Sequence, residues 1–170
     1  MDAMKIAAIV LVLIACVPDV RRRRIPNVLT LGAAVAGMLL HAVVGGTSGL
    51  LTSAAGWLVG AALFFPIFAM RGMGAGDVKL LAAVGAWLGP VLVFWVALIT
   101  SIAGGALGLV VAVFYGYTRK AIKNVVALLA YWRVVGPRPM PELTLDGARG
   151  PRLAYAIPIA IGTMVTLWLK

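Results

Sequence analysis

The sequence predicts an all-α integral membrane protein: a bundle of six transmembrane helices that forms one domain over residues 1–170, with both termini outside the cytoplasm. Three observations predict this class. The 170 residues are 63% hydrophobic and only 12% charged, whereas about a quarter of the residues in a soluble domain are charged. The mean hydropathy is +1.06. Basic residues lie between long apolar runs, as in the cytoplasmic loops of membrane proteins.

Charge and cysteine content exclude several other classes. A net charge of +10 would indicate nucleic-acid binding in a soluble protein, but no nucleic-acid partner is expected because the charges fall between apolar runs. A single cysteine excludes an internal disulfide, a four-cysteine zinc cluster and a Cys-x-x-Cys motif. Soluble packing cannot hide so much apolar surface at this length, so membrane lipid is the expected surroundings.

The first helix is expected over residues 3–18, with a soft boundary because Pro18 lies at its end. Its apolar run has the length of a signal-peptide core, which is about 7–15 residues. Two observations argue against a signal peptide. The strongest basic cluster, Arg21 to Arg24, follows the run, and no small-x-small cleavage site precedes the next apolar stretch. The segment is therefore interpreted as a retained transmembrane helix.

Two further helices follow. Pro26 is suited to open a helix over residues 26–44, because its missing N–H group is not needed in a first turn. An uncharged, glycine-rich turn at residues 45–49 leads to a helix over residues 50–70, which stops at Arg71. Both helices are close to the length of about 20 residues that a membrane crossing needs.

A glycine-rich break at residues 72–77 precedes two more crossings, whose boundary has two possible positions. A break at residues 89–90 gives a short fourth helix and a long fifth one, whereas a break at residues 104–105 gives two helices of ordinary length. We favour the first division because Gly-Pro is the stronger helix breaker. Both divisions contain two crossings, so the sidedness of the remaining segments is the same.

The only long polar segment covers residues 118–152 and is expected to be a cytoplasmic loop. Within it, residues 121–135 are apolar with interspersed basic and aromatic side chains, a pattern typical of an amphipathic helix on a membrane surface. A last transmembrane helix is expected over residues 153–169, with a kink at Pro158.

The distribution of basic residues supports six crossings. Thirteen of the fifteen Lys and Arg residues then share one side, at positions 21–24, 71 and 79 and within residues 118–152. The turns on the opposite side, at residues 45–49 and 89–90, have none. By the positive-inside rule the basic side is cytoplasmic.

Asp19 and Asp77 are two of only five acidic residues, and both fall at the inner boundary of the predicted bundle. A carboxylate beside lipid is costly, so it is a candidate functional group. Each also has a structural explanation, since arginines can neutralise Asp19 and Asp77 can cap a helix. If the fold brings them together, like charge prevents both from ionising, so one can take a proton from water while the other polarises a peptide carbonyl. This chemistry needs neither a metal nor a cofactor.

The glycines before Asp77 strengthen the hypothesis of a peptide-cleaving site. Gly72, Gly74 and Gly76 alternate along the chain, and glycine permits close approach of another backbone. An extended segment here can bind a substrate strand through backbone hydrogen bonds, although a flexible hinge has the same composition.

Two motifs together resemble the type IV prepilin peptidases, polytopic aspartic proteases with a Gly-x-Gly-Asp motif. The motifs are the stretch from Asp19 through four arginines to Asn27, and Gly74-Ala75-Gly76-Asp77-Val78-Lys79. Residues 80–89 and 155–162 also match, so the resemblance covers nearly the whole chain. It implies that Asp19 and Asp77 are catalytic, in an enzyme that removes the basic leader of prepilins or pseudopilins, typically after glycine, at the cytoplasmic face of the inner membrane.

The resemblance also implies a substrate helix that lies in the bilayer beside the bundle. Gly74 and Gly76 are expected to bind the substrate, and Arg71 or Lys79 to pair with an acidic residue of the mature pilin segment. Nothing in the chain matches the added cytoplasmic domain of larger members, so N-methyltransferase activity is not expected. The chain looks like the compact form found with Flp-type (tight-adherence) pilus systems, and the closely related archaeal preflagellin peptidases are the alternative.

Two other hypotheses use the same residues. A small transporter or channel component can use Asp19 and Asp77 for cations, because intramembrane acids mark ion pathways, but no acid lies mid-membrane to continue such a path. A non-enzymatic assembly subunit of a secretion machine is the third hypothesis. The only histidine, His41, and the only cysteine, Cys16, are interpreted as packing or interface residues.

Overall fold

The computed structural model describes residues 3–136, 138 and 154–170, which are helical apart from short connections. The elements are α1 (Ala3–Arg22), α2 (Asn27–Ala69), α3 (Ala75–Phe114), α4 (Thr118–Val135) and α5 (Ala156–Leu169). No strand occurs in this part of the chain. The predicted all-α class is confirmed for the described residues. Three of the helices, α1, α2 and α3, are long and apolar enough to cross a membrane, and α5 is apolar but shorter.

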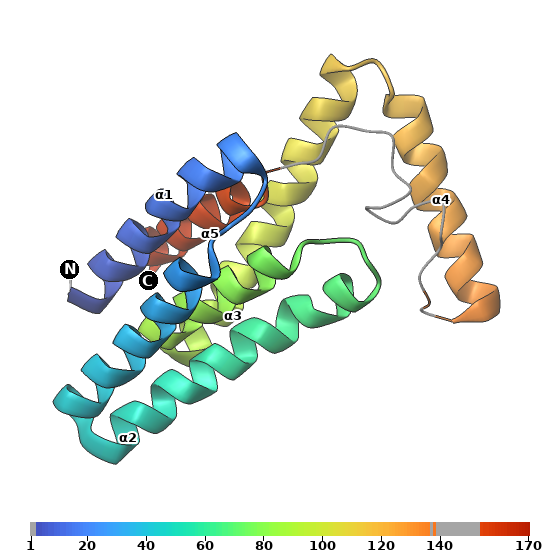
Figure 1. Ribbon diagram of the computed structural model, residues 1–170. Helices are drawn as coiled ribbons and strands as arrows, with labels where there is room; N and C mark the ends of the chain where they lie inside the picture. The colour runs from blue at the N-terminus through green and yellow to red at the C-terminus, as the bar shows by residue number, and fades with distance from the viewer. Residues whose placement is uncertain (1–2, 137, 139–153) are drawn as a thin grey trace.

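Two glycines divide the long helices α2 and α3 into legs that run back along each other (Figure 1). Gly46 in α2 has φ 57° and ψ −143°, and Gly89 in α3 has φ 79° and ψ 174°. Glycine adopts positive φ without a steric penalty, so the chain can reverse at these two points. The turn predicted within residues 45–49 and the preferred break at residues 89–90 are therefore confirmed. The alternative break at residues 104–105 is wrong, because α3 continues through it.

The first leg of α3, residues 75–88, is the centre of the bundle. Every residue from 80 to 86 is buried. This stretch has no polar side chain, and a helix that is apolar on all sides is stable only when it is surrounded. Helix α2 is the principal neighbour of α3, and both of its legs contact the first leg of α3, through Gly37 on one side and through Gly56 and Gly60 on the other.

Glycines bring the second leg of α2 against this central leg at backbone distance. A Cβ atom on Gly60 would lie 2.6 Å from the carbonyl oxygen of Leu81, and one on Gly85 would collide with the carbonyl oxygen of Gly56. Small residues are what allow helix backbones to approach closely within a membrane. A larger side chain at either glycine would force the two legs apart.

A buried hydrogen bond compensates for the proline at the bend of α3. Pro90 has no N–H group, so the carbonyl of Ala86, four residues earlier, lacks its helical donor. The fully buried hydroxyl of Ser53 in α2 donates to this carbonyl at 2.7 Å. Donation from a neighbouring helix is one way in which membrane helices tolerate proline. The same contact fixes the register of α2 against α3.

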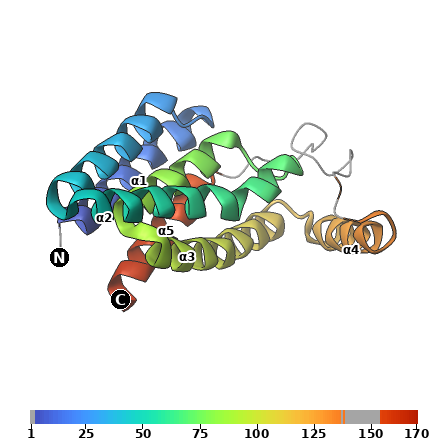
Figure 2. The ribbon, with the colours of Figure 1, turned by 90° about the horizontal axis from the view of Figure 1, so that it is seen from below.

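The helices α1 and α5 pack against α3 and against each other. The buried residues of α1 recur at helical spacing and form one stripe: Ala8, Leu11, Val12, Ala15 and Asp19. The start of α1, the bend in α2 and the end of α5 lie toward one end of the bundle, whereas the α1–α2 and α2–α3 connections lie toward the other (Figures 1 and 2). Asp19 therefore lies near the second end, together with the start of α3.

Two helix boundaries differ from the predictions. Helix α1 does not end at Pro18 but continues to Arg22, because an internal proline removes one backbone donor and a transmembrane helix tolerates that loss. Helix α5 begins at Ala156, so Pro158 lies in its first turn, where no N–H donor is needed. The predicted kink at Pro158 is therefore wrong. The predicted helix start at residue 153 lies outside the described residues.

Helix α4 extends away from the bundle (Figures 1 and 2). None of its residues is buried, and its principal contacts are with α3. It covers the segment 121–135 for which the sequence predicts an amphipathic helix. Most of the remaining 118–152 loop lies outside the described residues.

Candidate active site

Asp19 is a buried carboxylate at the end of an otherwise apolar stripe. It lies one turn beyond Ala15 on the inward face of α1 and is only 6% exposed, whereas Arg21 to Arg24 are all exposed. Its Oδ2 atom accepts a hydrogen bond of 3.0 Å from the backbone N–H of Ala156, the first residue of α5. The carboxylate is thus directed into the protein, away from the neighbouring arginines, by a donor that lies 137 positions later in the chain.

Asp77 occupies the first turn of α3, where the helix begins after the N-cap residue Gly74. Its carboxylate accepts a backbone hydrogen bond from Gly74, and its own N–H donates to the Gly74 carbonyl at 3.2 Å. This arrangement is one half of a capping box, in which a side chain three positions into the helix reaches back to the N-cap. A Cβ atom on Gly74 would lie 3.2 Å from the Asp77 Oδ2 atom. The glycine therefore leaves room for the carboxylate to fold back.

The fold brings the two aspartates together. Their carboxylates lie close enough for the charge of Asp19 to act on Asp77. The segments around them also pack together, since a Cβ atom on Gly76 would meet the side chain of Ile25, in the α1–α2 connection, at 3.4 Å. In addition, Lys79 Nζ donates to Asn27 Oδ1 at 2.9 Å. The end of α1 and the start of α3 thus form one cluster.

A third element, the start of α5, completes this cluster. Tyr155 immediately precedes the amide that binds Asp19, and the Asp77 carboxylate lies close enough for its charge to act on the tyrosine phenol. The Tyr155 ring packs edge-on against Phe64 of α2, with ring centroids 6.1 Å apart and an interplanar angle of 78°. Tyr155 and Ala156 therefore contact the surroundings of both aspartates.

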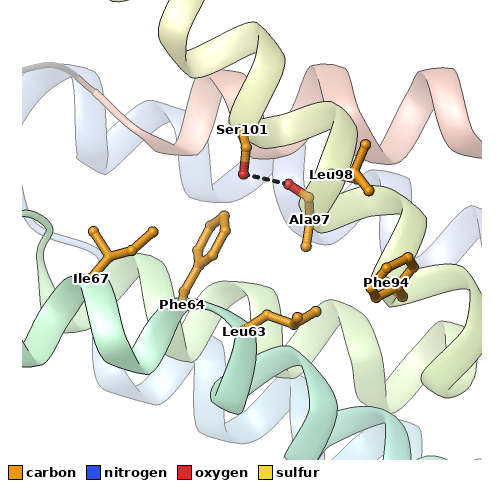
Figure 3. A pocket seen from close by; sticks show the side chains of 7 residues that line it. All are labelled: Leu63, Phe64, Ile67, Phe94, Ala97, Leu98 and Ser101. Carbon is orange, nitrogen blue, oxygen red and sulfur yellow. Dashed lines mark hydrogen bonds between the residues drawn. The ribbon is translucent and has the colours of Figure 1, made fainter. Parts of the chain in front are cut away.

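An apolar cavity of about 200 Å³ lies next to this cluster, between the second legs of α2 and α3 (Figure 3). It is lined by Leu63, Phe64, Ile67, Phe94, Ala97, Leu98 and Ser101. The hydroxyl of Ser101 donates to the carbonyl of Ala97 in its own helix at 2.8 Å, so the lining is effectively apolar. Because Phe64 lines the cavity and packs against Tyr155, the cavity lies beside the Tyr155 ring, and neither aspartate is among its lining residues.

Comparison with known proteins identifies this arrangement. The family model of the type IV leader peptidase family matches residues 6–109, a range that contains both aspartates. The chain belongs to the type IV leader peptidase family. The resemblance inferred from the two motifs is thereby confirmed.

Curated relatives of this leader peptidase family member point the same way. The chain is 37% identical over 102 residues to the prepilin leader peptidase/N-methyltransferase of Burkholderia pseudomallei, in strains 1026b and K96243 alike. The match covers 54% of the chain and 32% of each relative, so the chain spans about a third of their length. No solved structure matches the chain significantly. Tyr155 and Ala156 lie outside the range that the family model matches.

The predicted substrate-binding residues of this family member fall in different environments. Gly74 is extended, with φ −77° and ψ 147°, as a strand-binding segment requires. Gly76 is not, because α3 has already begun at Ala75, so the predicted extended stretch ends before it. Lys79 is exposed and bonded to Asn27. Arg71 is exposed, with φ 57°, in the α2–α3 connection.

Sequence reasoning did not assign a role to Tyr155 or Ala156. The interacting group of Ala156 is its backbone N–H, which every residue except proline has, so no side-chain pattern signals it. His41 interacts with the Gly37 carbonyl at 3.0 Å within its own helix, and Cys16 is a half-buried free thiol. Among the described residues, no group of three or more His, Cys, Asp or Glu side chains is placed to hold a metal ion.

Proposed function

We propose that the chain is a membrane-embedded aspartic endopeptidase that removes the basic leader peptide of a prepilin or pseudopilin at the cytoplasmic face of the membrane. The observation that carries the proposal is the proximity of Asp19 and Asp77, which come from separate helices of a type IV leader peptidase family member. The names of the curated relatives support the substrate class. Their N-methyltransferase activity is not part of the proposal, because the chain spans only about a third of their length.

The proposed reaction uses one water molecule and the two carboxyl groups. The proposed reaction starts with one carboxyl group ionised and the other protonated, because two like charges that share a site disfavour double ionisation. The ionised carboxylate takes a proton from water as the water oxygen attacks the carbonyl carbon, and the protonated carboxyl donates a hydrogen bond to the carbonyl oxygen. When the C–N bond breaks, the leaving amine takes up a proton from the pair. The burial of Asp19 supports this chemistry, since charge interactions are stronger away from bulk water.

The proposed orientation has six crossings: α1, the two legs of α2, the two legs of α3, and α5. The positive-inside rule then places Arg21 to Arg24, Lys79 and α4 at the cytoplasmic face of the inner membrane and both termini outside. The central leg, residues 75–88, spans only about 21 Å, less than the bilayer core of about 30 Å. Because protein surrounds this leg, it does not need to match the lipid thickness.

The substrate is proposed to enter from the bilayer. Its apolar helix lies beside the bundle, so that the leader extends to the cluster of aspartates at the membrane boundary. The N–H group of Gly74 is bonded to Asp77, so the proposed contact of this extended residue with the chain to be cleaved uses the second lone pair of the Gly74 carbonyl. One of the two exposed residues Lys79 and Arg71 is proposed to pair with an acidic residue of the mature pilin segment.

Cleavage of a co-expressed prepilin tests the proposal. Asp19→Asn and Asp77→Asn each remove an ionisable group while keeping its shape, and each is expected to lower the cleavage rate by at least about a hundredfold. Asp146→Asn makes the same chemical change elsewhere and is expected to leave processing unchanged. Protein levels are compared by immunoblot. Wild-type processing by either site variant would reject the aspartate pair, and absence of processing by the wild-type protein would favour the transporter or assembly-subunit hypothesis.

A further inference from the structure

At the start of α5, the ring of Tyr155 packs directly against Gly104 of α3, where a larger residue would collide with it. A Cβ atom on Gly104 would lie 2.5 Å from the Tyr155 hydroxyl oxygen, 2.9 Å from ring carbon Cζ and 3.2 Å from Cε2. The next residue, Gly105, has no atom within 4 Å of the corresponding position. The two adjacent glycines therefore have the same helix propensity but different surroundings, since Gly104 is buried against Tyr155 and Gly105 is exposed.

The residue after Tyr155 donates the hydrogen bond to Asp19. Tyr155 is the N-cap of α5, and the next N–H group, that of Ala156, donates to Asp19 Oδ2 at 3.0 Å in a buried environment. A backbone donor at a helix start has no competing partner within its own helix. The contact of the Tyr155 ring with Gly104 therefore lies one residue from the donor that binds the Asp19 carboxylate.

The other contacts of the ring tie the same junction to Asp77 and to the cavity. Tyr155 packs edge-on against Phe64, which lines the cavity shown in Figure 3. The charge of Asp77 acts on the Tyr155 phenol. The junction thus touches three parts of the site, which belong to α1, α2 and α3.

We propose that the Tyr155–Ala156 junction, seated against Gly104, is a positioning element that holds the Asp19 carboxylate in its productive orientation toward Asp77. The inference rests on the proposed aspartic peptidase activity and deepens it. Tyr155 acts through Ala156 and is a positioning residue rather than a catalytic one. Displacement of the Tyr155 side chain lowers the rate of the chemical step and leaves binding of the substrate helix unchanged.

The first experiment compares Gly104→Ala with Gly105→Ala in purified protein reconstituted in liposomes, with a synthetic prepilin as substrate. The atom nearest to the new methyl group of Gly104→Ala is the far end of the tyrosine side chain, so the ring moves and the fold survives. We expect kcat to fall about tenfold or more with KM unchanged, whereas Gly105→Ala keeps both values. Added to Gly104→Ala, Tyr155→Phe removes the atom nearest to the new methyl group and is expected to restore part of kcat.

The second experiment deletes the hydrogen bond itself. Nonsense suppression with an α-hydroxy acid gives Ala156→lactic acid, in which an ester oxygen replaces the N–H group and the side chain is unchanged. Loss of a donor to a charged group is expected to lower kcat about tenfold or more. Ala160→lactic acid, which removes an ordinary backbone donor of the same helix, is the matched control and is expected to change kcat less than about threefold.

The outcomes separate the two proposals. If Gly104→Ala and Ala156→lactic acid behave like their controls while the aspartate variants are inactive, the positioning role is rejected and the peptidase remains. A rise in KM with unchanged kcat in Gly104→Ala would also reject it. If Gly104→Ala fails to accumulate, the kcat of Ala156→lactic acid, compared with that of Ala160→lactic acid, tests the positioning role by itself. If the aspartate variants remain active, the proposed function itself fails.

Discussion

The first leg of α3 and the helix α4 are of similar length, yet their surroundings are opposite. Every residue from 80 to 86 is buried, whereas no residue of α4 is. The buried stretch has no polar side chain, while α4 has four basic residues: Arg119, Lys120, Lys123 and Arg133. In a membrane protein, uniform apolarity with small residues thus indicates a helix encased by protein, and interspersed charge indicates one held at a surface. The candidate site is built on the encased helix, which is held on all sides.

The largest expected effect concerns the encased leg. In Gly85→Ala the added Cβ atom would collide with the carbonyl oxygen of Gly56, which is backbone and cannot rotate away. Overpacking of this kind costs about 1–3 kcal/mol, occasionally more, so we expect a lower unfolding temperature in detergent and little prepilin cleavage. Gly32→Ala has open space around its new methyl group and is expected to be neutral or stabilising. Equal stability of the two variants would contradict the backbone-contact packing of the central leg.

A smaller effect is expected where α2 satisfies the bend of α3. Ser53→Ala leaves the Ala86 carbonyl buried without a donor, which costs about 1–3 kcal/mol. Ser101→Ala is the control. The Ser101 hydroxyl donates to the Ala97 carbonyl, which lies four residues earlier in the same regular helix and keeps its backbone donor when the hydroxyl is removed. Chemical unfolding in detergent gives both free energies. A loss in Ser53→Ala no greater than in the control would show that another group satisfies Ala86.

For α4, we propose that one face lies on anionic lipid. Ile122, Val125 and Leu129 are more than half exposed and share one side of the helix, and the segment has no acidic residue. In a peptide of residues 118–135, Leu129→Ala is expected to weaken binding to phosphatidylglycerol vesicles about tenfold. Val134→Ala removes an 86% exposed apolar side chain from the opposite side and is expected to have little effect. Equal weakening by both changes, or equal binding to neutral vesicles, would contradict a defined lipid-facing side.

The smallest effect is expected at Lys79, the exposed residue at the start of the encased leg. Lys79→Met loses the hydrogen bond to Asn27, which at an exposed position changes stability by less than about 0.5 kcal/mol. If Lys79 also pairs with an acidic residue of the substrate, KM rises by up to about fivefold, as for an exposed ion pair. Lys5→Met, at the other end of the bundle, is the control. An unchanged KM would remove Lys79 from the proposed substrate contacts.

Helix breakers were the most predictable features of the fold. Gly46 and Gly89 reverse the chain inside the two segments that the sequence marked, because glycine at positive φ and Gly-Pro act locally. Pro18 and Pro158 were misjudged, since the effect of a proline depends on its place within the helix and on its neighbours. The packing roles of Gly56 and Gly85 could not be predicted either, because contacts between distant backbones have no local pattern.

The candidate site was also predictable only where its residues carry a local sequence signal. Asp19 and Asp77 are rare acids beside helix ends, so the sequence predicts a shared boundary, and the structure places them together. Gly76 was expected in an extended stretch, but the capping arrangement of Asp77 on Gly74 starts the helix one residue before it. The Ala156 donor is a backbone group, which no motif can reveal.

The contact between Asp19 and Ala156 has a consequence for biosynthesis. Asp19 is translated early and its amide donor 137 positions later, so ribosomes finish four helices before the two groups can meet. Until the last apolar segment has inserted, the early carboxylate lacks this neighbour. An incomplete nascent chain in the membrane therefore carries both aspartates without the geometry described above.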